Sequence, residues 1–190
     1  MSSSTVMEIR ETLLKFQDGY ERRDPALMED FRKLFVPGDE LEVIGTGAVT
    51  PGEDEWCLGL ESSCDLFTND WEAWGDLKLD VEDAHVSSLG DVAWLATTGT
   101  VKMAMDPEET YTDYLDYIQG VAVDEDRDPK QRLIEILRGG SNTLFEAERG
   151  REYIWPLRFT AVLVRREGIW LFAQIQFSFA TTRFPDVRNT

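Results

Sequence analysis

Apolar positions near the start of the chain recur at helical spacing. They lie three or four residues apart, which places them on one face of a helix. They are Val6, Ile9, Leu13, Phe16 and Tyr20. A capping box formed by Thr5 and Glu8 predicts where this helix begins. Asp24-Pro25 predicts its end and the start of a second helix, because Asp caps helices and Pro suits the first helical position.

Later apolar positions change from helical to alternating spacing. A short strand at Leu41–Gly45 and a third helix at about Gly59–Trp74 precede this change. Alternation then predicts strands around residues 77–81 and 92–101. Two long strands, Tyr153–Arg166 and Ile169–Ala180, are expected to pair antiparallel across a tight turn. Helices grouped before strands are typical of an α+β fold.

Residues 104–142 differ in pattern from the segments on either side. Asp106-Pro107 opens a helical pattern, and an acidic loop follows at residues 124–128. A second short helix is predicted to end at Gly139-Gly140. A segment of about 40 residues can hardly bury a core alone. We therefore interpret residues 1–190 as a single domain with an insertion at about 104–142.

The charge of the chain excludes some classes of partner. Its 190 residues include 37 acidic and 19 basic side chains, which give a formal net charge of −18. Such a chain repels phosphate backbones and anionic lipids, so we expect no nucleic-acid and no membrane partner. Its only two cysteines, Cys57 and Cys64, do not make a disulfide framework, which favours a cytoplasmic location.

Five segments of the sequence together resemble one known family. They are "ERRDPALMEDF", "DELEVIGTG", "GLESSCDLFTNDW", "GDVAWLATTGTV" and "RFTAVLVRREGIWLFAQIQFS". In this order they resemble the SnoaL-like branch of the nuclear transport factor 2-like (NTF2-like) superfamily, whose fold is also called cystatin-like. The resemblance implies three N-terminal helices packed on a strongly bent antiparallel sheet, which forms a cone with an open mouth. It also implies a homodimer joined through the outer face of the sheet. Some relatives are enzymes and others are binding modules, so the fold alone selects no activity.

The ketosteroid isomerase chemistry of that superfamily finds no matching residues. It needs a Tyr donor, a carboxylate base and a protonated acid. By the resemblance, the Tyr position is Phe16 and the base position is Ile44 or Gly45. The acid position is Thr160 or Ala161. None of these residues carries the required group, so we do not expect this isomerisation.

Other candidate chemistry is sparse. The scytalone dehydratase pattern needs two histidines, and His85 is the only one in the chain. Arg158 could serve the Asp-Arg-Asp relay of the epoxide hydrolases, although no matching pair of acids is visible. The acidic loop at 124–128 resembles a calcium loop, but Pro129 stands where that loop needs Gly. We expect no metal and no cofactor, and the sequence leaves open whether the chain is an enzyme.

Aromatic side chains are expected around the mouth of the cone, where they either fill the core or line a ligand pocket. The orientation of the Tyr153–Arg166 strand is also open, with either Arg158 and Thr160 or Phe159 turned inward. An inward Arg158 would need an acidic partner or an anionic ligand. The candidate pocket residues are Phe16, Tyr20, Trp56, Phe67, Trp71, Arg158, Thr160, Ile175 and Phe177.

The last strand predicts a surface for self-association. Strict alternation puts Trp170 and Phe172 on the outer face of the sheet, together with Gln174 and Gln176. An apolar patch on that face suggests burial in a homodimer. The leading hypothesis is a domain that binds a small apolar or carbonyl-bearing molecule in the cone; as an enzyme it would be of the isomerase, hydrolase or cyclase type. The alternative is a non-catalytic homodimeric binding or assembly module.

Overall fold

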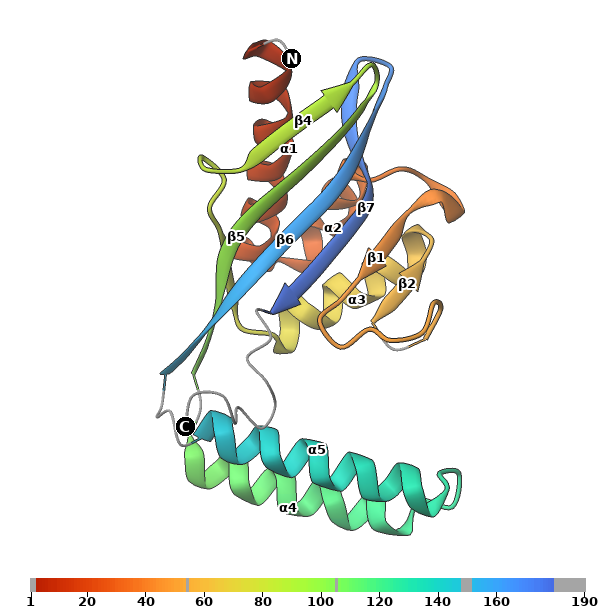
Figure 1. Cartoon of the computed structure of the whole chain (residues 1–190), viewed down its shortest axis with the longest axis vertical. Coiled ribbons are helices and arrows are strands. Elements are labelled where there is room, and N and C mark those ends of the chain that lie inside the picture. The colour runs from red at the N-terminus through yellow and green to blue at the C-terminus, as the bar shows by residue number, and fades with distance from the viewer. Residues whose placement is uncertain (1–2, 54, 105, 148–151, 180–190) are drawn as a thin grey trace. The chain divides into compact units, whose positions relative to one another are not determined.

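The computed structural model describes residues 3–53, 55–104, 106–147 and 152–179 (Figure 1). The chain divides into two compact units. Within the described residues, the first comprises residues 3–101 and 155–179 and contains helices and a sheet. The second comprises residues 102–154 and contains a helical hairpin. That the whole chain acts as a single domain with an insertion stays a prediction.

The N-terminal helices follow the apolar pattern closely. Helix α1 spans Ser3–Arg22, and its apolar stripe is buried from Ile9 to Tyr20. Asp24 then caps the next turn, because its carboxylate accepts a 2.9 Å hydrogen bond from the backbone N–H of Ala26. The predicted division at Asp24-Pro25 is confirmed, although the second helix is a series of short turns. These turns are η1 (Pro25–Leu27), α2 (Met28–Phe31) and η2 (Arg32–Leu34).

The predicted capping box at the start of α1 is wrong. The helix is already formed at Ser3, so Thr5 and Glu8 lie inside it. Glu8 acts elsewhere: its carboxylate accepts a 3.1 Å hydrogen bond from the indole of Trp170 and lies 3.3 Å from the guanidinium of Arg165. Glu8 thus connects α1 to the last two strands of the chain and does not cap the helix.

A seven-stranded sheet forms the other layer of the first unit, in the order β2-β1-β7-β6-β5-β3, with β4 paired to β5. The pairs β1–β2, β4–β5 and β6–β7 are antiparallel, whereas β1 and β7 pair in parallel. The strands are β1 (Glu42–Ile44), β2 (Trp56–Leu58), β3 (Asp76–Leu79), β4 (His85–Leu89), β5 (Val92–Ala104), β6 (Glu152–Arg166) and β7 (Ile169–Phe179). The predicted antiparallel pairing of the last two strands is confirmed, and Ala180 lies outside the described residues.

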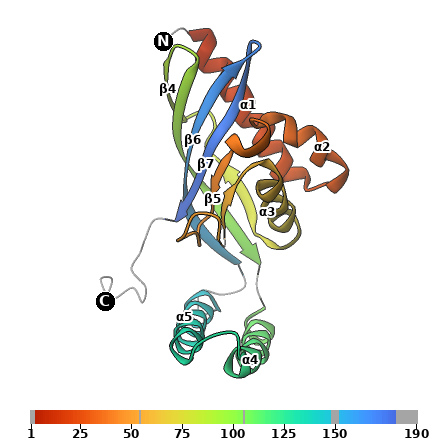
Figure 2. The same ribbon diagram turned by 90° about the vertical axis from the view of Figure 1, so that its right-hand side faces the viewer.

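Helices α1, α2 and α3 (Leu60–Ala73) lie together on one side of the sheet (Figure 2). This arrangement is the predicted α+β fold, with α3 where the sequence pattern placed it. The core between the two layers is largely aromatic. Phe16 is fully buried, and the centroid of its ring lies 5.2 to 6.3 Å from those of seven other rings.

A β-bulge between β6 and β7 overturns the predicted dimer surface. The register shifts between Val162 and Leu163, where Ala173 of β7 has no counterpart. Such a bulge reverses the face that the side chains beyond it occupy. Trp170 and Phe172 are therefore only 3% and 0% exposed, in the core with the other inward residues of β7. Their predicted position on the outer face is wrong, because strict alternation does not allow for the bulge.

The second unit is a hairpin of helices α4 (Pro107–Val123) and α5 (Pro129–Ala147). Asp106 caps α4 as its sequence predicts, since its carboxylate accepts from the N–H groups of Glu108 and Glu109. The predicted end at Gly139-Gly140 is wrong. Both glycines lie inside α5, where the Tyr114 ring of α4 packs so closely that a Cβ on Gly139 would lie 2.7 Å from it. No described helix is long and apolar enough to cross a membrane.

Candidate functional site

Six of the nine predicted pocket residues belong to the core of the first unit. They are Phe16, Tyr20, Phe67, Trp71, Ile175 and Phe177. Their rings and side chains pack against one another and against Phe31, Phe35, Phe159 and Phe172. The structure therefore brings these six residues together, and the space between helices and sheet is filled by their side chains.

The other three predicted pocket residues lie elsewhere. Arg158 and Thr160 are exposed, because Phe159 takes the inward position on β6. The guanidinium of Arg158 donates to the backbone carbonyl of Phe179 at 2.8 Å. Trp56 is half-buried on β2, where its indole donates a 2.8 Å hydrogen bond to Glu42. The prediction that Arg158 and Thr160 contribute to an inward-facing pocket is thus wrong, since the alternative orientation of the strand is the one observed.

A small cavity remains where the C-terminal end of α3 meets β7 and the loop between β1 and β2. Its volume is about 30 Å³. We call it the mouth cavity, and it is lined by Gly45, Thr46, Glu55, Leu66, Asp70, Trp74 and Phe177. A cavity of this size holds about one or two water molecules or the end of a larger ligand. It contains two carboxylates that the sequence pattern did not select.

Asp70 is the most unusual group in this cavity. Its carboxylate accepts a 2.7 Å hydrogen bond from the hydroxyl of Tyr20. Burial raises the pKa of Asp70 from 3.8 to about 6 and outweighs the opposing hydrogen bond from Tyr20. The negative charge of Glu55 raises this pKa further, while the positive charge of Arg23 lowers it. Burial, and then the charge of Asp70, raises the pKa of Tyr20 well above its ordinary value. The phenol therefore keeps its proton and donates a hydrogen bond to Asp70.

Glu55 is held in place by residues at the other end of its own loop, which joins β1 to β2. Its Oε2 accepts hydrogen bonds from the N–H of Gly47 at 2.7 Å and from the hydroxyl of Thr46 at 3.4 Å. The side chain folds over Gly45, where a Cβ would collide with it. A glycine directly after β1 therefore allows the carboxylate to reach the cavity.

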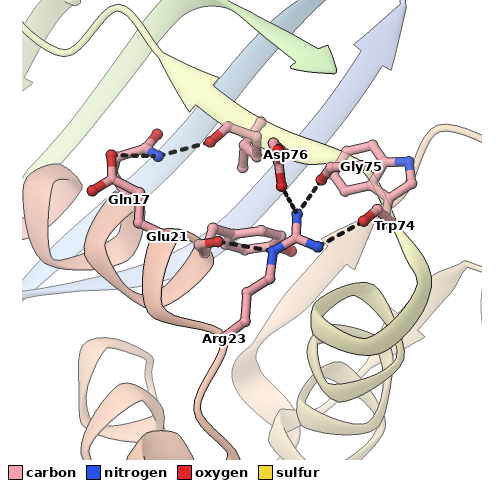
Figure 3. A network of polar contacts seen from close by, with 8 residues as sticks. Gln17, Glu21, Arg23, Trp74, Gly75 and Asp76 are labelled. Carbon is pink, nitrogen blue, oxygen red and sulfur yellow. Dashed lines mark hydrogen bonds and ion pairs between the residues drawn. The ribbon is translucent and has the colours of Figure 1, made fainter. Parts of the chain in front are cut away.

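Arg23 connects the end of α1 to the segment that follows α3 (Figure 3). Its guanidinium donates to the backbone carbonyls of Tyr20 at 3.1 Å and Trp74 at 2.8 Å. It also donates to the carbonyl of Gly75 and lies 3.4 Å from the carboxylate of Asp76. The backbone of Arg23 has a φ of 49°, a conformation that usually favours glycine, so an arginine there is retained at some cost in strain.

Gln17 fixes the same part of α1 against the edge of the sheet (Figure 3). Its amide donates to the carbonyl of Leu77 at 2.8 Å and accepts from the N–H of Leu79 at 2.7 Å. The side chain thus pairs with the backbone of β3 as a neighbouring strand would. Since Gln17 lies one turn before Tyr20, this contact and that of Arg23 hold the Tyr20 segment from both sides.

A larger hollow of about 270 Å³ lies between α1 and the turns that follow it, with Trp71 in its lining. Two of the charged residues in its lining, Arg22 and Asp18, pair with each other. A third, Asp30, pairs with Lys33, which does not line the hollow. Exposed ion pairs of this kind contribute little to stability. We therefore place the candidate site at the smaller mouth cavity, where burial perturbs an acid.

Other reactive residue types do not lie at this cavity. His85 is exposed on β4 and does not line it. Cys57 and Cys64 are buried free thiols, and burial raises the pKa of both, to about 11 for Cys64. Thiols in that state are poor nucleophiles. Among the described residues, no group of three or more His, Cys, Asp or Glu side chains could hold a metal ion.

One signal in the sequence points to this site. A buried tyrosine needs a partner for its hydroxyl, and Tyr20 ends an otherwise apolar stripe. The partner had to be a polar residue at the border of another buried stripe. Asp70 fits this description, because it lies between the buried residues Phe67 and Trp71 of α3. Glu55, in an irregular loop, gives no such signal.

Comparison with known proteins identifies the family. A model of the SnoaL-like domain matches residues 9–117. The chain belongs to the SnoaL-like domain family. Among proteins with curated functions, none matches the sequence.

Solved structures agree with this SnoaL-like assignment at the level of the fold. An NTF2-like superfamily protein from Salmonella enterica is 14% identical, with 96% of each chain covered and a TM-score of 0.57. A protein from Streptomyces avermitilis, proposed to be a dehydratase of the NTF2-like family, is 14% identical and has a TM-score of 0.58, with 95% of this chain and 99% of that chain covered. A ketosteroid isomerase-like protein from Erwinia carotovora is 11% identical and has a TM-score of 0.55, with 95% and 99% covered. At these identities the likeness concerns the fold alone.

Proposed function

We propose that this SnoaL-like domain is an enzyme that transfers a proton to or from a small carbonyl- or hydroxyl-bearing molecule at the mouth cavity. Asp70 is the proposed acid and base, and Tyr20 its hydrogen-bond partner. The observation that carries this proposal is the Asp70 carboxyl, whose pKa is raised to about 6. It lies in a cavity whose lining residues are mostly half-buried, so the cavity is open to solvent at its edge. A catalytic acid or base works best when its pKa lies near the working pH.

The proposed step uses only groups at this cavity. Ionised Asp70 removes a proton from the carbon next to the substrate carbonyl, and the electron pair moves onto the carbonyl oxygen as an enolate. Protonated Asp70 then returns the proton, either to the same carbon or to a leaving hydroxyl. The first route exchanges the hydrogen on that carbon or inverts its configuration, and the second expels water. Tyr20 keeps its hydrogen bond to the Asp70 carboxyl and so holds it towards the cavity.

The size of the cavity limits what enters. About 30 Å³ admits the reacting end of a substrate, and the core beyond is filled by aromatic rings. The cavity is too small to enclose a whole apolar ligand. The proposed substrate therefore lies at the surface and inserts only a small polar end. Catalysis of this kind by one positioned group contributes roughly 100- to 10,000-fold in rate.

Deuterium exchange tests the proposal without knowledge of the substrate. Acetone, hydroxyacetone, acetaldehyde and aminoacetone are incubated in D2O near neutral pH, and loss of the α-proton signal is followed by NMR. We expect exchange above the buffer rate for at least one probe, and its loss in Asp70→Asn. The control is Asp65→Asn, which removes an exposed carboxylate from the same helix. Exchange that persists in Asp70→Asn, or that never exceeds the buffer rate, would contradict the proposal.

A filled core also favours a second candidate, the non-catalytic homodimeric module. We propose a homodimer through the outer face of the sheet, at a site different from Trp170 and Phe172. Support comes from Leu89, Val92 and Trp94, neighbours on the outer side of β4 and β5 that are 78%, 43% and 48% exposed.

A reduced cytoplasm remains the proposed location, supported by two buried free thiols.

A further inference from the structure

We propose that the mouth cavity selects a cationic substrate, with an ammonium group bound between Glu55 and Asp70. This inference rests on the proposed function and adds to it the chemical class of the substrate. The cavity lining contains two acidic side chains, Glu55 and Asp70, and no Lys, Arg or His. Ionised carboxylates only accept hydrogen bonds, so they do not bind a carbonyl oxygen, whereas an ammonium group forms an ion pair and hydrogen bonds with both.

The positive charge of Arg23, which lowers the pKa of Asp70, already has other partners. Arg23 uses its guanidinium to bind the carbonyls of Tyr20, Trp74 and Gly75 and to pair with Asp76. It is not part of the cavity lining. Arg23 therefore holds the helix ends together and forms its ion pair with Asp76, not with a carboxylate of the cavity.

Helix geometry adds to the negative potential. Asp70 lies in the last turn of α3, which ends at Ala73, and Tyr20 lies in the last turn of α1, which ends at Arg22. The C-terminal end of a helix carries a partial negative charge and favours cations. The cavity lies at the C-terminal end of α3, which carries Asp70, and the guanidinium of Arg23 offsets part of the negative charge there through its bonds to the carbonyls of Tyr20 and Trp74.

The remaining walls suit an ammonium group with its carbon chain. Trp74 and Phe177 line the cavity with their ring centroids 5.8 Å apart and their planes at 83°. Aromatic faces attract cations, and Leu66 completes an apolar wall for a short alkyl chain. A volume of about 30 Å³ is small enough to suit an amine head and little more. The net charge of −18 would also draw cations to the protein and repel anions.

A bound cation would also prepare Asp70 for its proposed role. An ammonium group beside the carboxylate lowers its pKa, because an opposite charge favours the ionised form. Tyr20 and Arg23 act on Asp70 in the same direction, whereas Glu55 acts against them. The substrate would therefore increase the ionised fraction of its own base near neutral pH, and amines would bind more tightly above pH 6 than below it.

A matched series of ligands tests the charge preference directly. n-Butylammonium, n-butanol and butyrate have the same carbon chain and differ in charge. Their binding is followed through the indole N–H signal of Trp74 in 15N-labelled protein at constant ionic strength, with Trp74→Phe used to assign the signal. We expect n-butylammonium to bind at least tenfold more tightly than either of the others. Glu55→Gln should weaken its binding roughly fivefold to tenfold, because one of two nearby charges is lost.

Matched variants separate this site from general surface charge. Asp65→Asn removes one exposed acid from α3 and should leave the binding of n-butylammonium unchanged. Equal affinity for n-butylammonium and n-butanol would overturn the inference. So would a loss of affinity in Asp65→Asn as large as that in Glu55→Gln, because binding would then follow the overall charge.

The failure of this inference can be told apart from failure of the proposed function. Faster deuterium exchange of aminoacetone than of acetone or hydroxyacetone, relative to the rate in buffer, supports both. Equal exchange of charged and neutral ketones, lost in Asp70→Asn, would refute the cation preference and leave the proton transfer standing. Selective binding of n-butylammonium without any exchange would refute the proton transfer and leave a cation-binding site.

Discussion

The hydroxyl of Tyr20 on α1 donates a 2.7 Å hydrogen bond to the carboxylate of Asp70 on α3. Tyr20 is 1% exposed and its ring packs against Phe16 and Phe67, so the core fixes its position. Asp70 lies where that core ends and the cavity begins. The packing that stabilises the fold therefore also holds the acid on which the proposed chemistry depends.

Replacement of Tyr20 by Phe should raise the pKa of Asp70. The hydrogen bond from the phenol stabilises the carboxylate and lowers its pKa, so its loss leaves burial less opposed. The ring remains to fill the core. The measurement is a pH titration of the Asp70 carboxyl carbon by NMR. Tyr117→Phe is the control, because it removes a 2.7 Å hydrogen bond to Glu135 in the helical hairpin. An unchanged or lowered Asp70 pKa in Tyr20→Phe would contradict this role of the phenol.

Asp70→Asn should stabilise the protein near neutral pH. The pKa of Asp70 in the folded protein lies above its ordinary value, so the folded state binds more protons than the unfolded state between pH 3.8 and about 6. The contribution of Asp70 to the free energy of unfolding is therefore greatest below that window and decreases as the pH rises through it. Removal of the charge should increase stability by about 1–3 kcal/mol at neutral pH.

Urea unfolding at several pH values measures this effect. The wild-type protein should lose stability relative to Asp70→Asn as the pH rises from 4 to 6. Asp65→Asn, on the exposed side of the same helix, should remain within about 0.5 kcal/mol of wild type. A stability loss in Asp70→Asn at neutral pH would show that the carboxylate is a structural group. A gain supports a residue retained for function at a cost in stability.

Arg23→Gly should destabilise the protein although it relieves a strained backbone. Glycine accepts the φ of 49°, but the bonds to Tyr20, Trp74 and Gly75 are lost. Glu167→Gly is the matched control, because Glu167 has a φ of 52° in the exposed β6–β7 turn. We expect a loss of about 1–3 kcal/mol for Arg23→Gly and a gain of up to about 1 kcal/mol for Glu167→Gly. Equal effects in thermal unfolding would contradict a positioning role for Arg23.

The homodimer proposal predicts different effects for two tryptophans. Trp94→Glu places a charge on the exposed outer face and should convert a dimer to a monomer that unfolds at nearly the same temperature. Trp170→Ala removes a buried ring and should cost about 3–5 kcal/mol of stability without a specific effect on assembly. Light scattering and thermal unfolding distinguish the two. A wild-type monomer at micromolar concentration would refute the dimer.

Local patterns predicted the fold well because they report on local structure. Asp24 caps the turn that follows α1 and Pro25 fits its first position, and the spacing of Ile9, Leu13 and Phe16 buries them together when the segment is a helix. The bulge at Ala173 was not predictable in this way, since it depends on a mismatch between two strands. One unpaired residue moved Trp170 from the expected surface to the core.

The candidate site was only partly predictable for a related reason. Tyr20 and Phe177 were selected from their apolar context, and both touch the site. Asp70 and Glu55 come from a helix border and a loop, and their charges become unusual only when burial and the facing chain are known. Arg158 was selected for its charge, but the strand it occupies turns it to solvent. Sequence position gives the type of a polar group, whereas its function depends on what surrounds it.

The most direct test of the central claim is the pKa of Asp70 in the wild-type protein. The chemical shift of its carboxyl carbon is followed by NMR from acidic to neutral pH, with Asp70→Asn used to assign the signal. The account predicts a midpoint at about 6, together with deuterium exchange that rises through the same pH range. A midpoint near the ordinary value of 3.8 would contradict it, because Asp70 would then be a common surface carboxylate with no advantage as a base.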